Sequence, residues 1–81
     1  MTFDPRSFVE RLAPGEIITV DDLMERCKLT HSTSKRLLVS MTSTVVQPVF
    51  RAMGSNDKWT PHIMALVHLD STDIEVAFQR I

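Results

Sequence analysis

Two helix-start signals, at Thr19 and at Thr30, follow each other with no glycine or proline between them. Asp22 stands three residues after Thr19, which is a capping-box pattern, and Thr30 opens a polar run that turns basic and then apolar. These signals predict one helix over about residues 20–28 and a second that begins at Thr30, joined by a turn of roughly three to four residues. The segment 19–42 therefore has the spacing of a helix-turn-helix.

Apolar residues at helical spacing indicate which side of each helix faces the core. In the first helix the inward residues are Val20, Leu23, Met24 and Cys27, so the single cysteine is expected to be a core residue. In the second segment they are Leu29, Ser34, Leu37, Leu38 and Met41, and Leu37 is expected to be buried with Leu23, Cys27 and Met41. On the first turn and a half of the second helix, the residues expected to face solvent are His31, Ser32, Thr33, Lys35 and Arg36.

The N-terminal segment predicts a further helix and a short strand. Asp4 is placed to cap a helix, Pro5 suits its first position, and Phe3 and Phe8 occupy the positions of a hydrophobic staple. This helix is expected to run to about Ala13, where a proline and a glycine stop it. The β-branched residues that follow predict a brief strand ending at Ile18.

The second half of the chain predicts a β-hairpin and a terminal helix. Residues 45–52 are rich in β-branched and aromatic side chains, 54–57 have turn chemistry, and a return strand is expected from Trp59 to about Ile63. Residues 61–69 fit either a strand or a helix. A capping-box pattern at Thr72 and Glu75 predicts a helix over about residues 71–81, whose apolar face would carry Ile74, Phe78 and Ile81.

Charge is unevenly distributed along the chain. The net charge is −1, but residues 26–69 hold six bases against the single acid Asp57. Most of the acids lie in the two ends of the chain. A basic middle segment is a candidate electrostatic footprint for an acidic partner such as DNA, although uneven solvated faces give the same pattern.

The segment from Ile18 to Met41 resembles the helix-turn-helix of prokaryotic winged-helix transcription regulators. It matches their usual sequence at Thr19, Asp22, Leu23, Leu29, Ser32, Thr33, Arg36 and Leu38. It departs from that sequence at Ser34, where the family usually buries a valine, and lacks the glycine of the turn. The resemblance implies an α+β winged helix-turn-helix fold over residues 1–81 as a single domain. A three-helix core, a small β-hairpin wing over about 45–63 and the C-terminal helix would compose it.

This fold implies a DNA-binding module, a small transcription regulator that places the helix beginning near Thr30 in the major groove. The candidate DNA-binding residues on that helix and on the wing are His31, Ser32, Thr33, Lys35, Arg36, Arg51, Asn56 and Lys58. With few bases, one copy should bind weakly. A homodimer through Ile74, Phe78 and Ile81 would raise the affinity; the alternative is that this helix face packs on its own domain. The alternative is a protein-binding adaptor that keeps the winged-helix fold and makes no direct DNA contact.

Other function classes find little support in the sequence. It has no glycine-rich phosphate loop, no nucleophile motif and no paired histidine or cysteine spacing for a metal, so we expect no enzyme activity, no cofactor and no metal site. No apolar run is long enough for a membrane helix, and the N-terminus lacks the features of a signal peptide. We therefore expect a cytoplasmic protein with no membrane contact.

Overall fold

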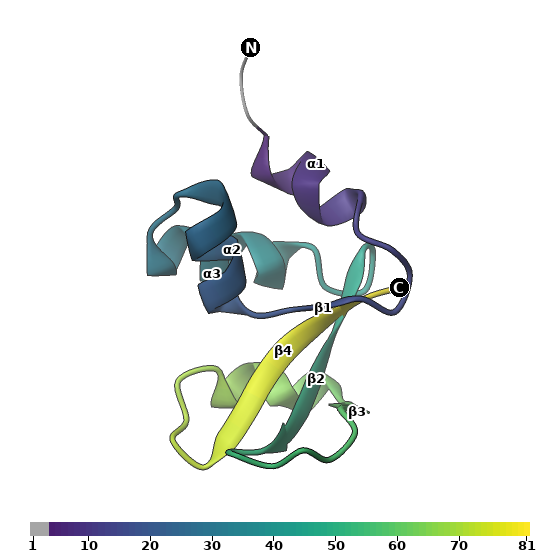
Figure 1. Cartoon of the computed structure of the whole chain (residues 1–81), viewed down its shortest axis with the longest axis vertical. Coiled ribbons are helices and arrows are strands. Elements are labelled where there is room, and N and C mark those ends of the chain that lie inside the picture. Colours follow the sequence, from purple (N-terminus) through teal and green to yellow (C-terminus); the bar gives the residue numbers. More distant parts are fainter. Residues whose placement is uncertain (1–3) are drawn as a thin grey trace.

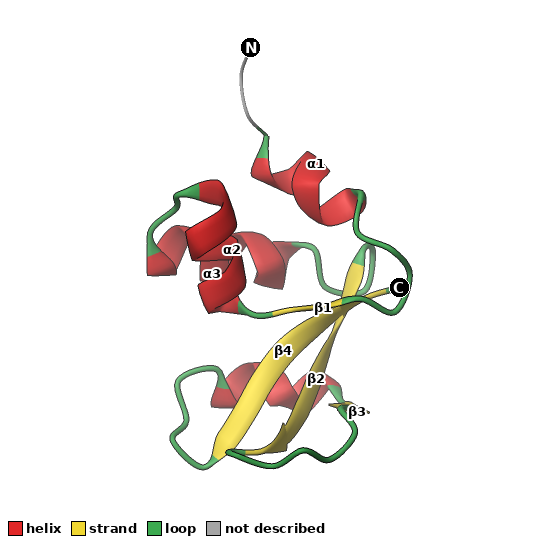
Figure 2. Cartoon of the chain, in the orientation of Figure 1, coloured by secondary structure: helices red, strands yellow, loops and turns green. Residues whose placement is uncertain are grey.

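Residues 4–81, the part of the chain described by this computed structural model, form an α+β fold (Figures 1 and 2). Its elements in chain order are α1 (Pro5–Glu10), β1 (Ile17–Ile18), α2 (Val20–Cys27), α3 (His31–Ser40), β2 (Val46–Ala52), β3 (Thr60–Pro61), the 3₁₀ helix η1 (Ile63–His68) and β4 (Ile74–Arg80). The strands make one antiparallel sheet in the order β1-β4-β2-β3. In Figure 1 the three α-helices lie toward one end of the long strands β2 and β4, and η1 lies toward the other.

The predicted helix starts are confirmed at all three α-helices. The Asp4 carboxylate accepts a hydrogen bond from the Arg6 N–H at the start of α1. At α2 the capping box is complete, because Asp22 N–H donates to the Thr19 hydroxyl and Thr19 N–H donates to the Asp22 carboxylate, each at 3.0 Å. The Thr30 hydroxyl accepts from Thr33 N–H at the start of α3. Helix α1 ends earlier than predicted, at Glu10, and the predicted staple partner Phe3 lies outside the described residues.

The turn between α2 and α3 contains no glycine. Lys28 takes the left-handed conformation after α2, with φ 56° and ψ 44°, and its N–H donates to the Met24 carbonyl. Leu29 N–H donates to the same carbonyl. This is the position where a helix usually ends on glycine, since a side chain there is strained. Lys28 therefore occupies the left-handed position at the end of α2 where the resembled family has a glycine.

The core lies between the α-helices and one face of the sheet. Its fully buried side chains include Val9, Ile18, Leu23, Leu38, Met41, Val46 and Phe78, and Cys27 is buried among them as predicted. Burial raises the pKa of the Cys27 thiol, so it stays protonated at neutral pH. Leu37, which we expected to be buried, is only partly buried at the core's margin, because the inward side of α3 is centred on Ser34, Leu38 and Met41.

Ser34 is fully buried, and its hydroxyl has no hydrogen-bond partner among the described residues. An unsatisfied buried hydroxyl costs about 1–3 kcal/mol. The inward position of Ser34 is as predicted. This side chain is a weak point in the packing of α3, at the site where the resembled family buries valine.

The predicted C-terminal helix over 71–81 is wrong, because residues 74–80 form β4. β4 lies between β1 and β2, with Ile17 opposite Gln79 and Pro48 opposite Phe78. Ile74, Val76 and Phe78 alternate at the period of a strand, and this alternation competes with the helical spacing of Ile74 and Phe78. The predicted cap at Thr72 is not used. Ser71 instead accepts hydrogen bonds from the N–H groups of Asp73 and Ile74 and turns the chain into the strand.

The proposed dimer surface is lost with that helix. Phe78 is fully buried in the core of its own chain, and Ile74 is partly buried in the same strand. Only Ile81 remains well exposed. The three side chains therefore do not form one helix face on which a second copy could pack.

The predicted hairpin is present in a shorter form. β2 covers the expected strand, but the return strand is only Thr60–Pro61, which pairs with Val49 and Phe50. The open question about residues 61–69 is answered by η1, which follows β3 directly and packs against β2 and β4. His62 caps η1 through its Nδ1 atom, which accepts from Met64 N–H. All of β2 also pairs with β4 on its other side, so β2 lies between β4 and the short return strand.

Candidate nucleic-acid interface on α3

The outward face of α3 lies opposite its buried side. Because Ser34, Leu38 and Met41 face the core, a helix of 3.6 residues per turn directs Ser32 and Arg36 to solvent. Both are exposed, and neither side chain has a hydrogen-bond or ion-pair partner among residues 4–81. We call Ser32 and Arg36 the α3 stripe. Its hydroxyl and its guanidinium are available to a partner.

The neighbouring polar residues of α3 are exposed but differently engaged. The Thr33 hydroxyl accepts a 2.9 Å hydrogen bond from the Thr30 hydroxyl, so it serves the helix start. His31 lines a cavity that it shares with the first turn of α2. Of the three predicted polar contacts at the start of α3, only Ser32 points to open solvent without a local partner within the described chain.

Lys35 forms an ion pair within the chain. Its Nζ atom lies 2.8 Å from the Asp70 carboxylate, in the segment between η1 and β4. The hydrogen bond and charge of Lys35 lower the pKa of Asp70, and His31 contributes in the same direction. The structure thus places an acid beside the first turns of α3, where the sequence alone predicted only bases.

Acid should release this ion pair. Because the pKa of Asp70 is lowered in the folded chain, its contribution to stability is fully present above its unfolded pKa and is lost as the pH falls through the lower folded value. The effect on stability should be small, since Asp70 is exposed. An NMR titration of the Asp70 carboxyl carbon measures it directly. Lys35→Gln should raise the pKa of Asp70, and a titration that is unchanged in this variant would show that the ion pair does not form in solution.

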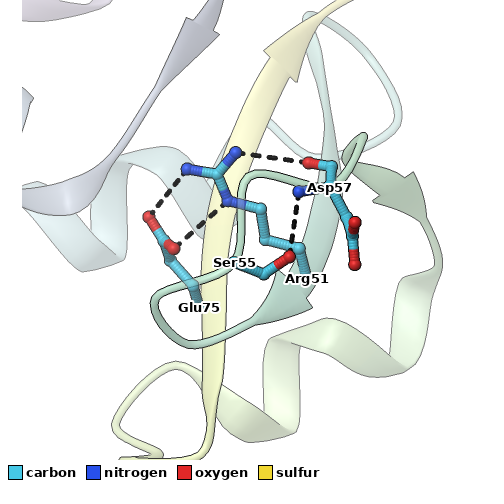
Figure 3. A network of polar contacts seen from close by, with 4 residues as sticks. All are labelled: Arg51, Ser55, Asp57 and Glu75. Carbon is cyan, nitrogen blue, oxygen red and sulfur yellow. Dashed lines mark hydrogen bonds and ion pairs between the residues drawn. The ribbon is translucent and has the colours of Figure 1, made fainter.

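Arg51, predicted to contact DNA from the wing, makes several contacts within its own chain (Figure 3). Its guanidinium contacts the Glu75 carboxylate through two hydrogen bonds of 3.2 and 3.4 Å, and a third reaches the Asp57 carbonyl. It also lies 4.1 Å from the centroid of the Trp59 ring, within the range of a cation–π contact. Glu75 stands directly opposite Arg51 in the sheet. Arg51 therefore ties the loop after β2 to β4.

The remaining residues predicted for the wing, Asn56 and Lys58, are exposed in the loop between β2 and β3. The start of that loop comes near α3, because Met53 and Gly54 line the same cavity as His31. The structure thus brings the start of the β2–β3 loop to the start of α3, and leaves Arg36 and Lys58 as predicted bases with no ion-pair partner among residues 4–81.

Two acids that shape this region were missed by sequence reasoning. Asp70 and Glu75 pair with the predicted DNA-binding residues Lys35 and Arg51. Both pairs depend on where the segment after η1 runs, and a terminal helix would not have placed the acids there. The period-two alternation of Ile74, Val76 and Phe78 was the signal that could have located them.

Searches against protein-family models, curated proteins and solved structures give no match to this chain. Within residues 4–81 no group of three or more histidine, cysteine, aspartate or glutamate side chains is arranged to hold a metal ion. Among the same residues, no helix has both the length and the apolar character needed to cross a membrane.

Proposed function

We propose that the chain is a winged helix-turn-helix domain that binds double-stranded DNA through α3, as a small cytoplasmic transcription regulator. The order of elements supports the fold. A helix, a short strand and two helices joined by a tight turn precede the antiparallel strands β2 and β4, and β1 pairs with β4. The β2–β3 hairpin and η1 would together form an enlarged wing.

The observation that carries the proposal is the α3 stripe. A helix fits the major groove, and side chains on its first turns reach base edges and phosphates. Ser32 and Arg36 are exposed on the first two turns and carry no internal bonds within the described chain. Arg36 would pair with a guanine or a phosphate, and Ser32 would donate to a phosphate. The exposed base Lys28 follows α2 and would add a contact to the DNA phosphate backbone.

The charges beside α3 limit the strength of this binding. Lys35 would have to exchange Asp70 for a phosphate, and Arg51 is held by Glu75. Fewer free bases neutralise fewer phosphates, and each neutralised phosphate contributes about 0.9 to the salt slope. We therefore expect a single copy to bind DNA weakly, with a shallow salt slope set by the few bases that are free.

Arg36→Ala tests the proposal. If Arg36 reads a guanine, affinity for duplexes that contain the site should fall by roughly 1–3 kcal/mol; if it contacts a phosphate, the salt slope should drop by about one. Fluorescence anisotropy with a series of duplexes of defined, differing sequence, at low and physiological salt, measures both effects. Arg11→Ala is the matched control, because Arg11 is an exposed base just after α1 and its loss changes the net charge equally. Equal effects of the two variants would contradict a specific role for α3.

The second candidate function is the protein-binding adaptor with the same fold. The specific observation in its favour is the acidity around α3, where Asp70 lies beside Lys35 and Asp21 and Asp22 occupy the first turn of α2. Wild-type protein that fails to bind any duplex at low salt would favour the adaptor over the DNA-binding domain.

A further inference from the structure

A groove of about 630 Å³ lies between the first turn of α2, the start of α3 and the segment that leads into β4. Its apolar lining side chains include Val20, Leu69, Ile74 and Val76, and polar groups make up almost half of its surface. The volume falls within the about 300–1,000 Å³ typical of binding sites. We call this cavity the α2–β4 groove. The α3 stripe, Ser32 and Arg36, is not part of it.

The walls of the α2–β4 groove are fixed by hydrogen bonds. On one side the Thr19–Asp22 capping box sets the first turn of α2. On the other side the Lys35–Asp70 ion pair links the segment after η1 to α3, although this exposed pair adds little stability. Met53 N–H donates to the Asp73 carbonyl at 3.0 Å and closes the end of the β2–β4 pair. The groove is therefore formed before any partner arrives, which lowers the ordering cost of binding.

The charge of the groove is one-sided. Asp21 and Asp22 line it, and none of the described residues that line it is a lysine or an arginine. Asp21 is exposed and has no bonded partner among residues 4–81, whereas Asp22 uses one oxygen in the capping box. Glu75 also lines the groove, but its carboxylate is paired with Arg51. The free carboxylates repel phosphate and favour a cationic partner.

We propose that the α2–β4 groove docks a basic segment of a partner protein. An aliphatic side chain of the segment packs against Val20, Leu69 and Ile74, and flanking lysine or arginine side chains pair with Asp21 and Asp22. The apolar side chains of the groove favour such a segment over a small hydrophilic cation, because burying the aliphatic side chain supplies binding energy and the charges supply specificity. The proposal is independent of DNA binding by the α3 stripe.

The test uses the full chain and a synthetic peptide in which one leucine is flanked by lysines. In an NMR titration, shifts should concentrate on the amides of Val20 to Asp22, Leu69 and Ile74 to Val76. A peptide with serine in place of the leucine should bind several-fold more weakly, and one with glutamates in place of the lysines should not bind. Shifts centred on Arg36 or on η1, or no saturable binding, would overturn the proposal.

Asp21→Asn should weaken binding of the lysine peptide several-fold. Glu25→Gln is the matched control, because Glu25 is an exposed acid on the same helix, does not line the groove and makes the same change in net charge. Equal weakening in the two variants would mean that the peptide senses only overall charge, and would overturn docking in this groove. Neither variant should lose DNA affinity, whereas Arg36→Ala should. A failure of the groove proposal can therefore be distinguished from a failure of the DNA-binding proposal.

Discussion

Replacing Phe78 with alanine is expected to destabilise the protein by about 3–5 kcal/mol. Phe78 is fully buried and packs with Ile18, Leu38 and Val46 in the core between the α-helices and the sheet. Truncation removes the largest fully buried side chain and leaves a cavity. Domains of this size are stable by only about 5–15 kcal/mol, so the loss is a large part of the total. Equilibrium unfolding in urea, followed by circular dichroism, measures it.

Ile81→Ala is the control for this variant. Ile81 follows β4 and is 53% exposed, so its truncation should change the free energy of unfolding by no more than about 0.5 kcal/mol. Similar small effects at both positions would contradict the placement of Phe78 in the core. If the urea midpoint of unfolding rises with protein concentration in the wild type but not in Phe78→Ala, this segment would instead contribute to a dimer contact.

Leu38→Ala is expected to cost about 2–5 kcal/mol, and Leu37→Ala clearly less. The two leucines are adjacent on α3, but Leu38 is fully buried whereas Leu37 is only partly buried at the margin of the core. The comparison holds helix propensity and side-chain chemistry constant and varies only burial. Thermal and urea unfolding of both variants measure the difference. The reverse ranking would mean that α3 is rotated from the orientation that directs Ser32 and Arg36 outward.

Local signals predicted the helical half of the fold well. The caps at Asp4, Thr19 and Thr30 depend on residues two or three positions apart, so the sequence contains all the information they need. The inward face of α3 was located to within one residue, since Ser34, Leu38 and Met41 are buried as predicted and only Leu37 is less buried than expected.

The prediction of a helix for the C-terminal segment was wrong, because local sequence patterns cannot decide between a helix and a strand there. Ile74 and Phe78 fit a helical face, and the same segment fits a strand through the alternation with Val76. Tertiary context decides between the two, because β4 gains hydrogen bonds from both β1 and β2. No short-range signal announces those two partners, one of which lies near the other end of the chain.

The candidate site was predicted only in part, because some of its contacts join residues that are distant in the sequence. The exposure of His31, Ser32, Thr33 and Arg36 follows from helical periodicity and agrees with the structure. The ion pairs of Lys35 with Asp70 and of Arg51 with Glu75 join residues far apart in the sequence. Charge counted along the sequence therefore overstated the number of free bases, since two of those in the basic middle segment are neutralised by acids from the C-terminal part.

The position of β4 also determines the order in which the chain can assemble. β1 and β2 do not pair with each other, and each finds its main partner only in β4. During synthesis from the N-terminus, α2 and α3 can pack as soon as they emerge, because their contact is local. Ile18 and Val46 lack Phe78, their partner in the core, until residues 74–80 are made. Closing the loop from Ile17 to Gln79 costs more entropy than any helix contact, so sheet formation should be the slow step of folding and the interval in which the nascent chain is most prone to aggregate.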